Sequence, residues 1–410
     1  MGNKVYENQK KTLDYSKKAI DKAADSIRHG VKGQERKDAI KVIQNFREVH
    51  LYPLMLMKNH LVRTANKVSK TKNIIVARRL KRLPTIINKL ERPTLDGGKT
   101  DNRIKFTRMQ DIGGCRAIVK NIKQLNELRT KLENSRSVHK IIRVNEYLIP
   151  KESGYGGIHL IYSCFEDSKT DNPWKKLKIE VQLRTELQHH WATSLEIIDI
   201  VESLNLKTSS GNHYQWRKFF SCAGTLVAHK EGANVLDPDE YFQTVCGMLS
   251  AEMAISAITT LARSALSIES ATSEISLGRF PKSTTGMFLL DFFIEDKKLN
   301  TRIRHYNSRN IDNALTDYAE SESNEKVNLS VLLSAEDAMN LKKAYPNYFG
   351  SSSQFIKFIK DEAESLYNLL KFEDDAVIYN DDLVLKMPKE ESSALKGHLE
   401  MLINLYKNRK

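Results

Sequence analysis

The fold is decided by residues 111–119, which read Asp-Ile-Gly-Gly-Cys-Arg-Ala-Ile-Val. The run from Ile112 to Val119 is short and mostly apolar, which is typical of a buried β-strand. Asp111 lies at the beginning of this run, immediately before its apolar positions. A carboxylate at the N-terminal end of a buried strand indicates either a local hydrogen bond or a functional site, and this residue alone does not distinguish the two.

The segments that follow alternate between strand and helix patterns. A helix is predicted at 125–132, and another helix is predicted from 185 to about 201. Strands are predicted at 141–148, 158–165 and 177–183. Because not every strand pair is bridged by a helix, we expect an α+β fold with a mixed or antiparallel sheet rather than a doubly wound one.

The N-terminal region predicts helices. In residues 1–70 the apolar positions Ile20, Ala23, Ala24 and Ile27 share one helical face, and a second helix pattern ends before Pro53. A third helix is expected from about residue 74 to residue 93, with Arg79 and Lys81 crowded near one end.

The second half of the chain is expected to be helical from 214 to 278, with one long apolar-faced segment at 237–270. Beyond residue 278, strands are predicted at 287–294 and 327–333, with helices at 310–321, 335–344, 354–371 and 394–407. We therefore divide the chain into an N-terminal helical region (1–44), an α+β core (45–205), a helical extension (206–278) and a C-terminal α+β regulatory or binding domain (279–410).

Composition bounds the function classes. The 410 residues carry a formal net charge of +14, which favours anionic partners such as nucleotides or RNA. No apolar run reaches the length of a membrane span or has the form of a signal peptide. We therefore expect a cytoplasmic protein with no membrane partner.

A second carboxylate accompanies Asp111. Glu180 begins the alternating run Glu180-Val181-Gln182-Leu183-Arg184, so that Glu180, Gln182 and Arg184 share one face of a strand. If the two strands are neighbours, Asp111 and Glu180 converge, and two carboxylates with phosphate oxygens form a sparse Mg²⁺ site. The alternative is two strand-end acids, each with a local hydrogen bond.

Cations and an aromatic residue complete the set. Arg79 and Lys81 suit polyphosphate charge, although a solvated helix face explains them equally well. Gly154 and the pair Gly156-Gly157 allow a tight turn that exposes the ring of Tyr155 for base stacking. A glycine hairpin around a core tyrosine is the alternative. Together, cations, paired carboxylates and an aromatic residue indicate a nucleotide phosphotransferase.

The order and spacing of these motifs resemble the synthetase domain of the RelA/SpoT family, the alarmone synthetases. The family pattern Arg-x-Lys is matched at residues 79–81, and Ser-Ile-x-x-Lys-Leu at 85–90, with Thr85 for Ser. The pattern Gln-Asp-Ile-x-Gly-x-Arg is matched at 110–116, the lysine–tyrosine–histidine loop at 151–159, and Glu-x-Gln-x-Arg-Thr at 180–185. The resemblance covers roughly residues 45–205 and implies a nucleotidyltransferase-like mixed sheet flanked by helices.

The resemblance also implies a reaction, in which a pyrophosphate group moves from ATP to the ribose 3′-hydroxyl of an acceptor nucleotide and AMP is released. For the donor it implies that Arg79 and Arg116 sandwich adenine and that Lys81 and Thr85 meet the ATP phosphates. Asp111 and Glu180 are expected to hold Mg²⁺, with Glu180 also accepting the proton of the 3′-hydroxyl.

For the acceptor, the resemblance implies that Tyr155 stacks on the base and that Lys151 and His159 meet phosphates, with Gln182 completing the acceptor-binding set. Three functions remain open. The first is synthesis of guanosine tetra- or pentaphosphate from GDP or GTP, and the second is a toxin that pyrophosphorylates the 3′-CCA end of tRNA. The third is a non-catalytic nucleotide sensor.

Two further features bear on these alternatives. Gly156-Gly157 stands where family members that use GDP or GTP often have Arg-Ser, which removes a cation and favours tRNA. No His-Asp dipeptide is present, so we expect a synthetase without a hydrolase domain, and such an enzyme needs restraint, for which its own C-terminal region is a candidate. A homo-oligomer or a regulatory protein partner is a further expectation. The acidic stretch 373–382 is a candidate for such restraint, through contact with the basic face around Arg79.

Overall fold

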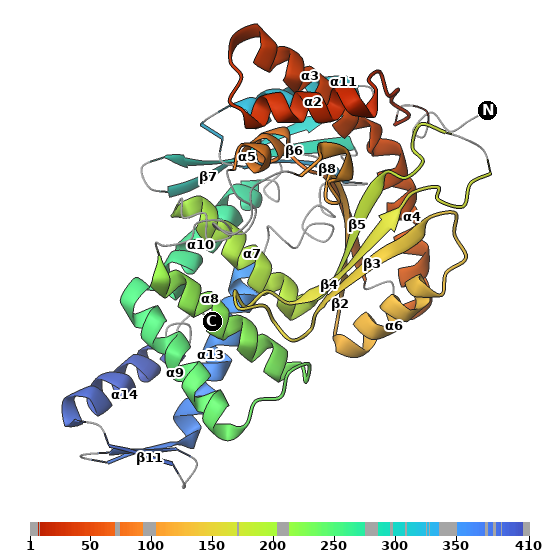
Figure 1. Cartoon of the computed structure of the whole chain (residues 1–410). Coiled ribbons are helices and arrows are strands. Elements are labelled where there is room, and N and C mark those ends of the chain that lie inside the picture. Colours follow the sequence, from red (N-terminus) through yellow and green to blue (C-terminus); the bar gives the residue numbers. More distant parts are fainter. Residues whose placement is uncertain are drawn as a thin grey trace. The chain divides into compact units, whose positions relative to one another are not determined.

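The structure is a computed structural model that describes residues 7, 9–69, 74–92, 104–169, 172–202, 213–274, 286–295, 298–307, 310–324, 326–327, 329–335, 351–373, 376–379, 383–386 and 388–404. The chain divides into two compact units (Figure 1). The first comprises Met1–Tyr147, Gly157–Glu186 and Ala319–Glu325, and the second Leu148–Gly156, Leu187–Tyr318 and Lys326–Lys410. The four-part division made from the sequence stays a prediction.

A five-stranded mixed sheet forms the centre of the first unit. Its strands are β1 (Ile75–Leu80), β2 (Gly113–Val119), β3 (Lys140–Tyr147), β4 (Gly157–Ser163) and β5 (Lys178–Thr185), in the order β1-β2-β5-β4-β3. Only β2 and β5 pair in parallel, and the other neighbours are antiparallel. The predicted α+β class with a mixed sheet is confirmed.

One face of this sheet is apolar and covered. In β5 the residues Ile179, Val181 and Leu183 are fully buried, whereas Glu180 and Gln182 between them stay partly accessible. Helices α4 (Leu51–Val68) and α6 (Ile122–Glu133) pack against β2 and β5 (Figure 1). Because successive side chains of a strand point to opposite faces, this alternation places the polar residues on the other face.

A second core lies in the N-terminal layer, where α2 (Lys17–Arg28), α3 (Gly33–Val49) and α5 (Leu83–Glu91) pack with the 3₁₀ turn η1 (Phe106–Arg108). The predicted apolar face of α2 is buried, and Ser16 caps the helix by accepting a hydrogen bond from the Ala19 amide at 3.2 Å. Phe46 of α3 and Phe106 meet edge to face in this core.

The predicted helix at 74–93 is wrong in its first half. Residues Ile75–Leu80 form β1, which pairs antiparallel with β2, and a helix begins only at Leu83. Pro84 explains the boundary, because proline lacks the amide that a helix interior needs but fits the first helical turn. Arg79 therefore lies on β1 and Lys81 directly follows this strand, so the two residues do not share a helix.

The second unit is built on helices α7 (Glu186–Val201), α8 (Tyr214–Lys230), α9 (Pro238–Ile255), α10 (Ala257–Glu274), α13 (Ser351–Leu369) and α14 (Lys389–Asn404). Their buried residues form one core, in which Phe220 of α8 stacks on Phe355 of α13. The helices on both sides of residue 278 thus share this core.

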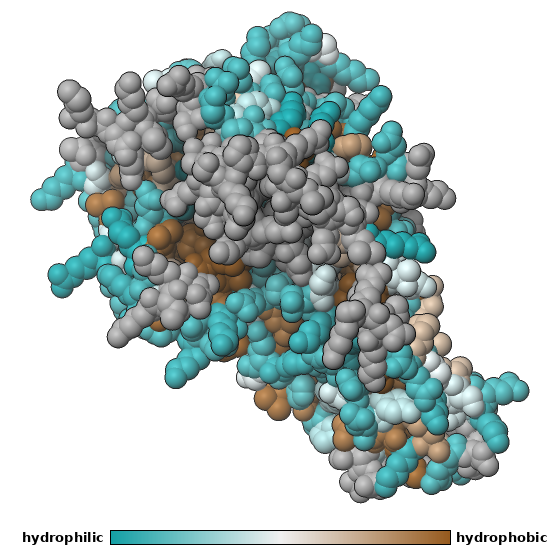
Figure 2. Space-filling view, turned by 180° about the vertical axis from the view of Figure 1, so that it is seen from behind, coloured by the Kyte–Doolittle hydropathy of each residue, from teal (hydrophilic) through white to brown (hydrophobic). Residues whose placement is uncertain are grey.

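The long segment predicted at 237–270 is broken. Ser256 adopts φ 50°, a left-handed conformation that ends α9 and separates it from α10. Among the described residues, no single helix is long and apolar enough to cross a membrane, although α9 with Ala257–Ala265 passes the same test as a pair bent by 69°. Hydrophilic side chains cover most of the described surface seen in Figure 2.

The C-terminal region contains two small sheets. One has the order β7-β6-β8, from β6 (Gly286–Glu295), β7 (Lys298–Tyr306) and β8 (Leu329–Ala335), with α11 (Ile311–Ser323) between β7 and β8. The other joins β9 (Leu370–Phe372), β10 (Ala376–Tyr379) and β11 (Leu383–Lys386).

Several sequence predictions for this region are tested by these elements. The elements predicted at 287–294 and 327–333 (strands) and at 310–321, 354–371 and 394–407 (helices) are confirmed in type by β6, β8, α11, α13 and α14, although residues 370–371 belong to β9 and residues 405–407 lie outside the described part. The strands β7 and β9–β11 were not predicted. The predicted helix at 335–344 falls almost wholly outside the described residues. Four acids of the stretch 373–382 also lie outside them, namely Asp374, Asp375, Asp381 and Asp382.

Candidate active site

The polar face of the central sheet gathers the predicted site residues of the first unit. Glu180 of β5 pairs with Gly114 of the parallel strand β2, and Gln182 pairs with Arg116 on one side and with His159 of β4 on the other. Paired residues in a sheet point to the same face. The strand after Asp111 and the strand of Glu180 are therefore neighbours, which is the condition under which the two carboxylates were expected to converge.

Glu180 is held by two hydrogen bonds. Its Oε1 lies 2.9 Å from Nδ1 of His159, and its Oε2 accepts a bond of 2.7 Å from the amide of Gln182. Burial acts to raise the pKa of Glu180, but these two bonds outweigh it and lower the pKa below its ordinary value, against a repulsive contribution from Asp111. Glu180 is thus ionised at neutral pH and lies close enough to Asp111 for the two charges to interact.

Gln182 connects Glu180 to two arginines. While its amide nitrogen donates to Glu180, its Oε1 accepts from Nε of Arg116 and from Nη2 of Arg184, both at 3.4 Å. The chemistry of the partners fixes the orientation of this amide, because only its nitrogen donates and only its oxygen accepts. The two arginines, the amide of Gln182, the carboxylate of Glu180 and the imidazole of His159 therefore form one row across β2, β5 and β4.

Asp111 is held by charge. Its carboxylate accepts from Nζ of Lys81 at 2.9 Å and from Nζ of Lys89 at 3.2 Å. Burial opposes ionisation, yet the two ammonium groups lower the pKa of Asp111 to about 2. The pKa of Lys81 is also lowered, because burial and repulsion from Lys89 and Arg79 outweigh the single carboxylate. The cluster therefore carries more positive than negative charge.

Two further residues of the expected ATP-binding set are Arg79 and Thr85. Arg79 lies on β1 opposite Gly114 of β2 and is exposed, and Thr85 lies in the first turn of α5, half-buried. The backbone N–H of Lys81 donates to the carbonyl of Ile112 at 2.7 Å, which ties the end of β1 to the segment that carries Asp111.

Lys151 and Tyr155 belong to the second unit, and their loop is positioned there by a glycine contact. Gly154 has φ +84°, and a Cβ built on it would lie 2.4 Å from the carbonyl oxygen of Phe220. A Cβ on Gly224 of α8 would lie 2.0 Å from the carbonyl oxygen of Gly154. Because both distances are far below van der Waals contact, this approach requires glycine on both sides.

Hydrogen bonds complete the docking of the loop. Oγ of Ser221 donates to the carbonyl of Glu152 at 2.6 Å, and the amide of Lys151 donates to the carbonyl of Tyr155 at 3.0 Å. Tyr155 itself is half-buried, with its ring edge-on to Trp191 at 6.2 Å and Nζ of Lys151 5.9 Å from its centroid. This packing leaves both sequence interpretations of Tyr155, base platform and core residue, as predictions.

The carboxylates of Asp111 and Glu180 are suitable ligands for Mg²⁺. Among the described residues no group of three or more His, Cys, Asp or Glu side chains converges, so a metal held by protein ligands alone finds no site there. Mg²⁺ is commonly bound by one or two carboxylates with phosphate oxygens and water, and Asp111 and Glu180 provide two ionised carboxylates on adjacent segments. The two acids are therefore a suitable pair for a metal that arrives with a nucleotide.

Three residues on or beside this sheet face were absent from the predicted site, and Lys89 reaches it from α5. Lys89 was noticed only as part of a matched motif, and Arg184 only as a residue sharing the face of Glu180. Tyr147 on β3, whose ring lies edge-on to His159 at 5.4 Å, gave no signal because the pairing of β3 with β4 places it there. Lys89 and Arg184 were open to detection by the same spacing rules that selected their neighbours.

The part of the chain that carries this site is similar to known proteins. Residues 78–197 match the family model described as the region found in RelA / SpoT proteins. No curated protein matches the chain in sequence.

Solved structures with detectable likeness include the small alarmone synthetase 1 from Bacillus subtilis bound to its product pppGpp, at 20% identity and a TM-score of 0.36, covering 45% of this chain and 92% of that one. The small alarmone synthetase 2 from Bacillus subtilis shows 24% identity and a TM-score of 0.35, with 46% and 92% covered. A GTP pyrophosphokinase family protein from Streptococcus pneumoniae shows 24% identity and a TM-score of 0.35, with 46% and 87% covered.

Proposed function

We propose that this protein is a pyrophosphokinase that transfers pyrophosphate from ATP to the 3′-hydroxyl of a guanine nucleotide, because residues 78–197 match the region found in RelA / SpoT proteins. The observation that carries the proposal is the pair of ionised carboxylates on adjacent segments, Asp111 within a lysine cluster and Glu180 within a hydrogen-bonded row. Transfer of a phosphoryl group depends on positioning and charge neutralisation, and this face offers both.

The lysine cluster supports a donor site. Lys81 and Lys89 share one carboxylate and repel each other and Arg79, so a bound polyphosphate relieves this repulsion. Arg79 on β1 and Arg116 on β2 lie on the same face of neighbouring strands, as two cations that enclose a planar base require. Thr85, in the first turn of α5, adds a hydroxyl donor for a phosphate oxygen.

The reaction balances as follows. The acceptor 3′-oxygen forms a bond to the β-phosphorus of ATP, the bond from that phosphorus to the α,β-bridging oxygen breaks, and AMP leaves. The hydroxyl proton passes to the carboxylate of Glu180. Because the pKa of Glu180 is lowered, the proton does not rest there and passes on to water, while Nδ1 of His159 at 2.9 Å holds the carboxylate in place.

Asp111 and Glu180 are the residues that would hold Mg²⁺. When bound, the metal supplies charge neutralisation to the phosphates in transfer. The protein residues do the rest: Gln182 fixes the orientation of Glu180, and Arg116 and Arg184 fix Gln182.

The tRNA 3′-CCA end is the second candidate acceptor. The net charge of +14 suits a phosphate backbone, and Gly156-Gly157 leaves the acceptor loop without the arginine that a free nucleotide's phosphates favour. Lys151, Tyr155 and His159, in contrast, are all present, which supports a free nucleotide. The guanine nucleotide is therefore our first choice.

One experiment tests these alternatives. The purified full-length protein is incubated with γ-labelled ATP and Mg²⁺ and with GDP, GTP or total tRNA, and the products are separated by thin-layer chromatography. Label in guanosine tetra- or pentaphosphate supports the proposal, whereas label in tRNA alone replaces it with the second candidate. If no acceptor is labelled although ATP binds, the chain is a nucleotide sensor and the proposed reaction is wrong.

A further inference from the structure

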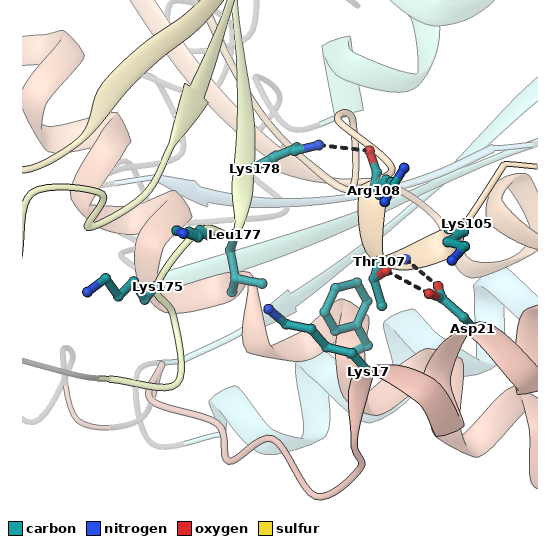
Figure 3. A pocket seen from close by; sticks show the side chains of 10 residues that line it. Lys17, Asp21, Lys105, Thr107, Arg108, Lys175, Leu177 and Lys178 are labelled. Atoms are coloured by element: carbon teal, nitrogen blue, oxygen red, sulfur yellow. Dashed lines mark hydrogen bonds between the residues drawn. The ribbon is translucent and has the colours of Figure 1, made fainter.

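A second cationic site lies in the first unit, between α2, η1 and the segment that leads into β5 (Figure 3). It is a half-open pocket of about 320 Å³. None of its lining residues belongs to the candidate active site. Its member Lys178 does precede Glu180 by two positions on β5, so the two side chains leave the same face of the strand.

The lining is strongly basic. Six cations and one carboxylate, Asp21, line the pocket, and the cations are Lys17, Lys105, Arg108, Lys175, Lys176 and Lys178. Both carboxylate oxygens of Asp21 are already hydrogen-bonded. One accepts from the backbone amide of Thr107 at 3.0 Å and the other from the hydroxyl of Thr107 at 2.9 Å (Figure 3). The pocket therefore presents an excess of positive charge that its own carboxylate does not balance.

Two lysines of the pocket donate hydrogen bonds to backbone carbonyl groups. Nζ of Lys178 donates to the carbonyl of Arg108 at 3.3 Å, and Nζ of Lys175 donates to that of Ser168 at 3.2 Å. Lys176 has Glu166 only at 4.0 Å. A carbonyl carries no net charge, so these bonds hold the ammonium groups in place without neutralising them.

Two of the cations lie close to each other. Nζ of Lys178 reaches the backbone of Arg108, so both positive side chains leave neighbouring points of the lining. An anion that binds among these groups offsets the repulsion between their charges.

The floor of the pocket decides what kind of anion fits. It is formed by Phe46 and Leu177, which are 2% and 7% exposed, so the pocket offers a dry surface but no open aromatic face. Apart from Asp21 and Thr107 its polar side chains are donors only, so the pocket has the means to recognise negative oxygens and none to read a base. A dry floor also strengthens the attraction between the cations and an anion.

We propose that this pocket is a binding site for a short polyphosphate chain, either free or as part of a nucleotide, separate from the candidate active site. The α2 and α3 helices supply Lys17, Asp21 and Phe46, so the site depends on the N-terminal helical layer. Binding of a polyphosphate at this pocket does not require catalysis, so it can be tested independently of the proposed reaction.

Site-resolved lysine labelling tests the proposal on the wild-type protein. An amine-reactive reagent is applied with and without inorganic triphosphate, and each lysine is quantified by peptide mass spectrometry. At a ligand concentration ten times Kd, mass action predicts a roughly tenfold fall in labelling at Lys17, Lys105 and Lys178. Lys120 and Lys123, just before and within α6, should be unchanged, because α6 packs against the opposite face of the sheet.

Further arms of the same experiment identify the ligand. Protection by triphosphate and by ATP, with none by adenosine, supports recognition of the phosphate chain, and protection by triphosphate alone identifies the free anion. Protection of the active-site lysines without protection of Lys17 and Lys105 overturns the proposal. Equal protection by sodium chloride at matched ionic strength, or protection by single-stranded RNA only, also overturns it.

A charge-reversal variant gives an independent readout by calorimetry. Lys17→Glu/Lys105→Glu alters two exposed rim lysines and should weaken triphosphate binding at this site by roughly tenfold or more. The matched control, Lys120→Glu/Lys123→Glu, makes the same change in net charge elsewhere and should leave the affinity unchanged. Equal weakening in both variants would show that only the overall charge matters and would reject a specific site.

Discussion

The sheet face and the loop at 148–156 carry the two halves of the predicted site, and they are positioned by different forces. On the sheet face, ion pairs and hydrogen bonds orient each side chain, as with Asp111 between two lysines and Glu180 between His159 and Gln182. In the loop, a backbone contact between Gly154 and Gly224 positions Lys151 and Tyr155. The first arrangement is sensitive to charge, and the second to the size of a single side chain.

The largest effect is expected on the sheet face. Glu180→Gln keeps the shape of the side chain but removes its charge and its capacity to accept a proton, so kcat should fall by about 10³-fold. Multiple-turnover assays with labelled ATP measure this loss. The control Glu127→Gln, on exposed α6, should keep wild-type turnover, and retained turnover in Glu180→Gln would reject its assigned role.

Asp111→Asn should have a smaller effect, about 10²-fold in kcat/KM for ATP, because Lys81 and Lys89 remain to bind the phosphates. Raising the Mg²⁺ concentration should recover part of the activity if Asp111 contributes chiefly to metal binding. A Mg²⁺ titration of both proteins measures this. Identical Mg²⁺ dependence in variant and wild type would contradict a metal-binding role.

The glycine contact offers the corresponding change in the loop. Gly224→Ala places a Cβ 2.0 Å from the carbonyl oxygen of Gly154, so the loop must move. We expect KM for the acceptor to rise by about 10- to 100-fold, since small misplacements of binding groups have large kinetic costs, while ATP binding is spared.

The control for this variant is Gly397→Ala in α14, where an added Cβ meets nothing within 4 Å. Steady-state kinetics with each substrate varied in turn measure the two KM values. Circular dichroism confirms that the helices remain. Equal loss for donor and acceptor would show that the contact supports the fold and not the position of the loop.

The smallest effect concerns stability. Because the pKa of Asp111 is lowered to about 2 in the folded protein, its ion pairs stabilise the fold above pH 4 and lose this contribution as the pH falls towards 2. The expected difference is about 2 kcal/mol in the free energy of unfolding. Denaturation at pH 5 and pH 2.5 should show a smaller acid-induced loss for Asp111→Asn than for the wild type. Equal losses would mean that Asp111 is not held by the lysines in solution.

Much of the first unit was predictable. The alternation of Glu180-Val181-Gln182-Leu183 predicted a strand with one polar face, and the apolar run after Asp111 predicted a second strand, whose parallel pairing with the first only the structure shows. The residues 75–80 were misassigned, because Arg78 and Arg79 interrupt the apolar pattern of an edge strand. Pairing with β2 and the proline at position 84 decide the structure there.

By itself the sequence determined which residues bear the chemistry and which strand faces they share, because side-chain alternation is a local property of the backbone. Only the tertiary structure decided that Lys89 joins Lys81 on Asp111, that His159 contacts Glu180 and that Gly154 approaches Gly224. Each of these contacts joins residues far apart in the chain, and the order of strands and the packing of helices bring them together. The cationic pocket between α2 and β5 has the same origin, since its lysines come from separate segments that no local pattern connects.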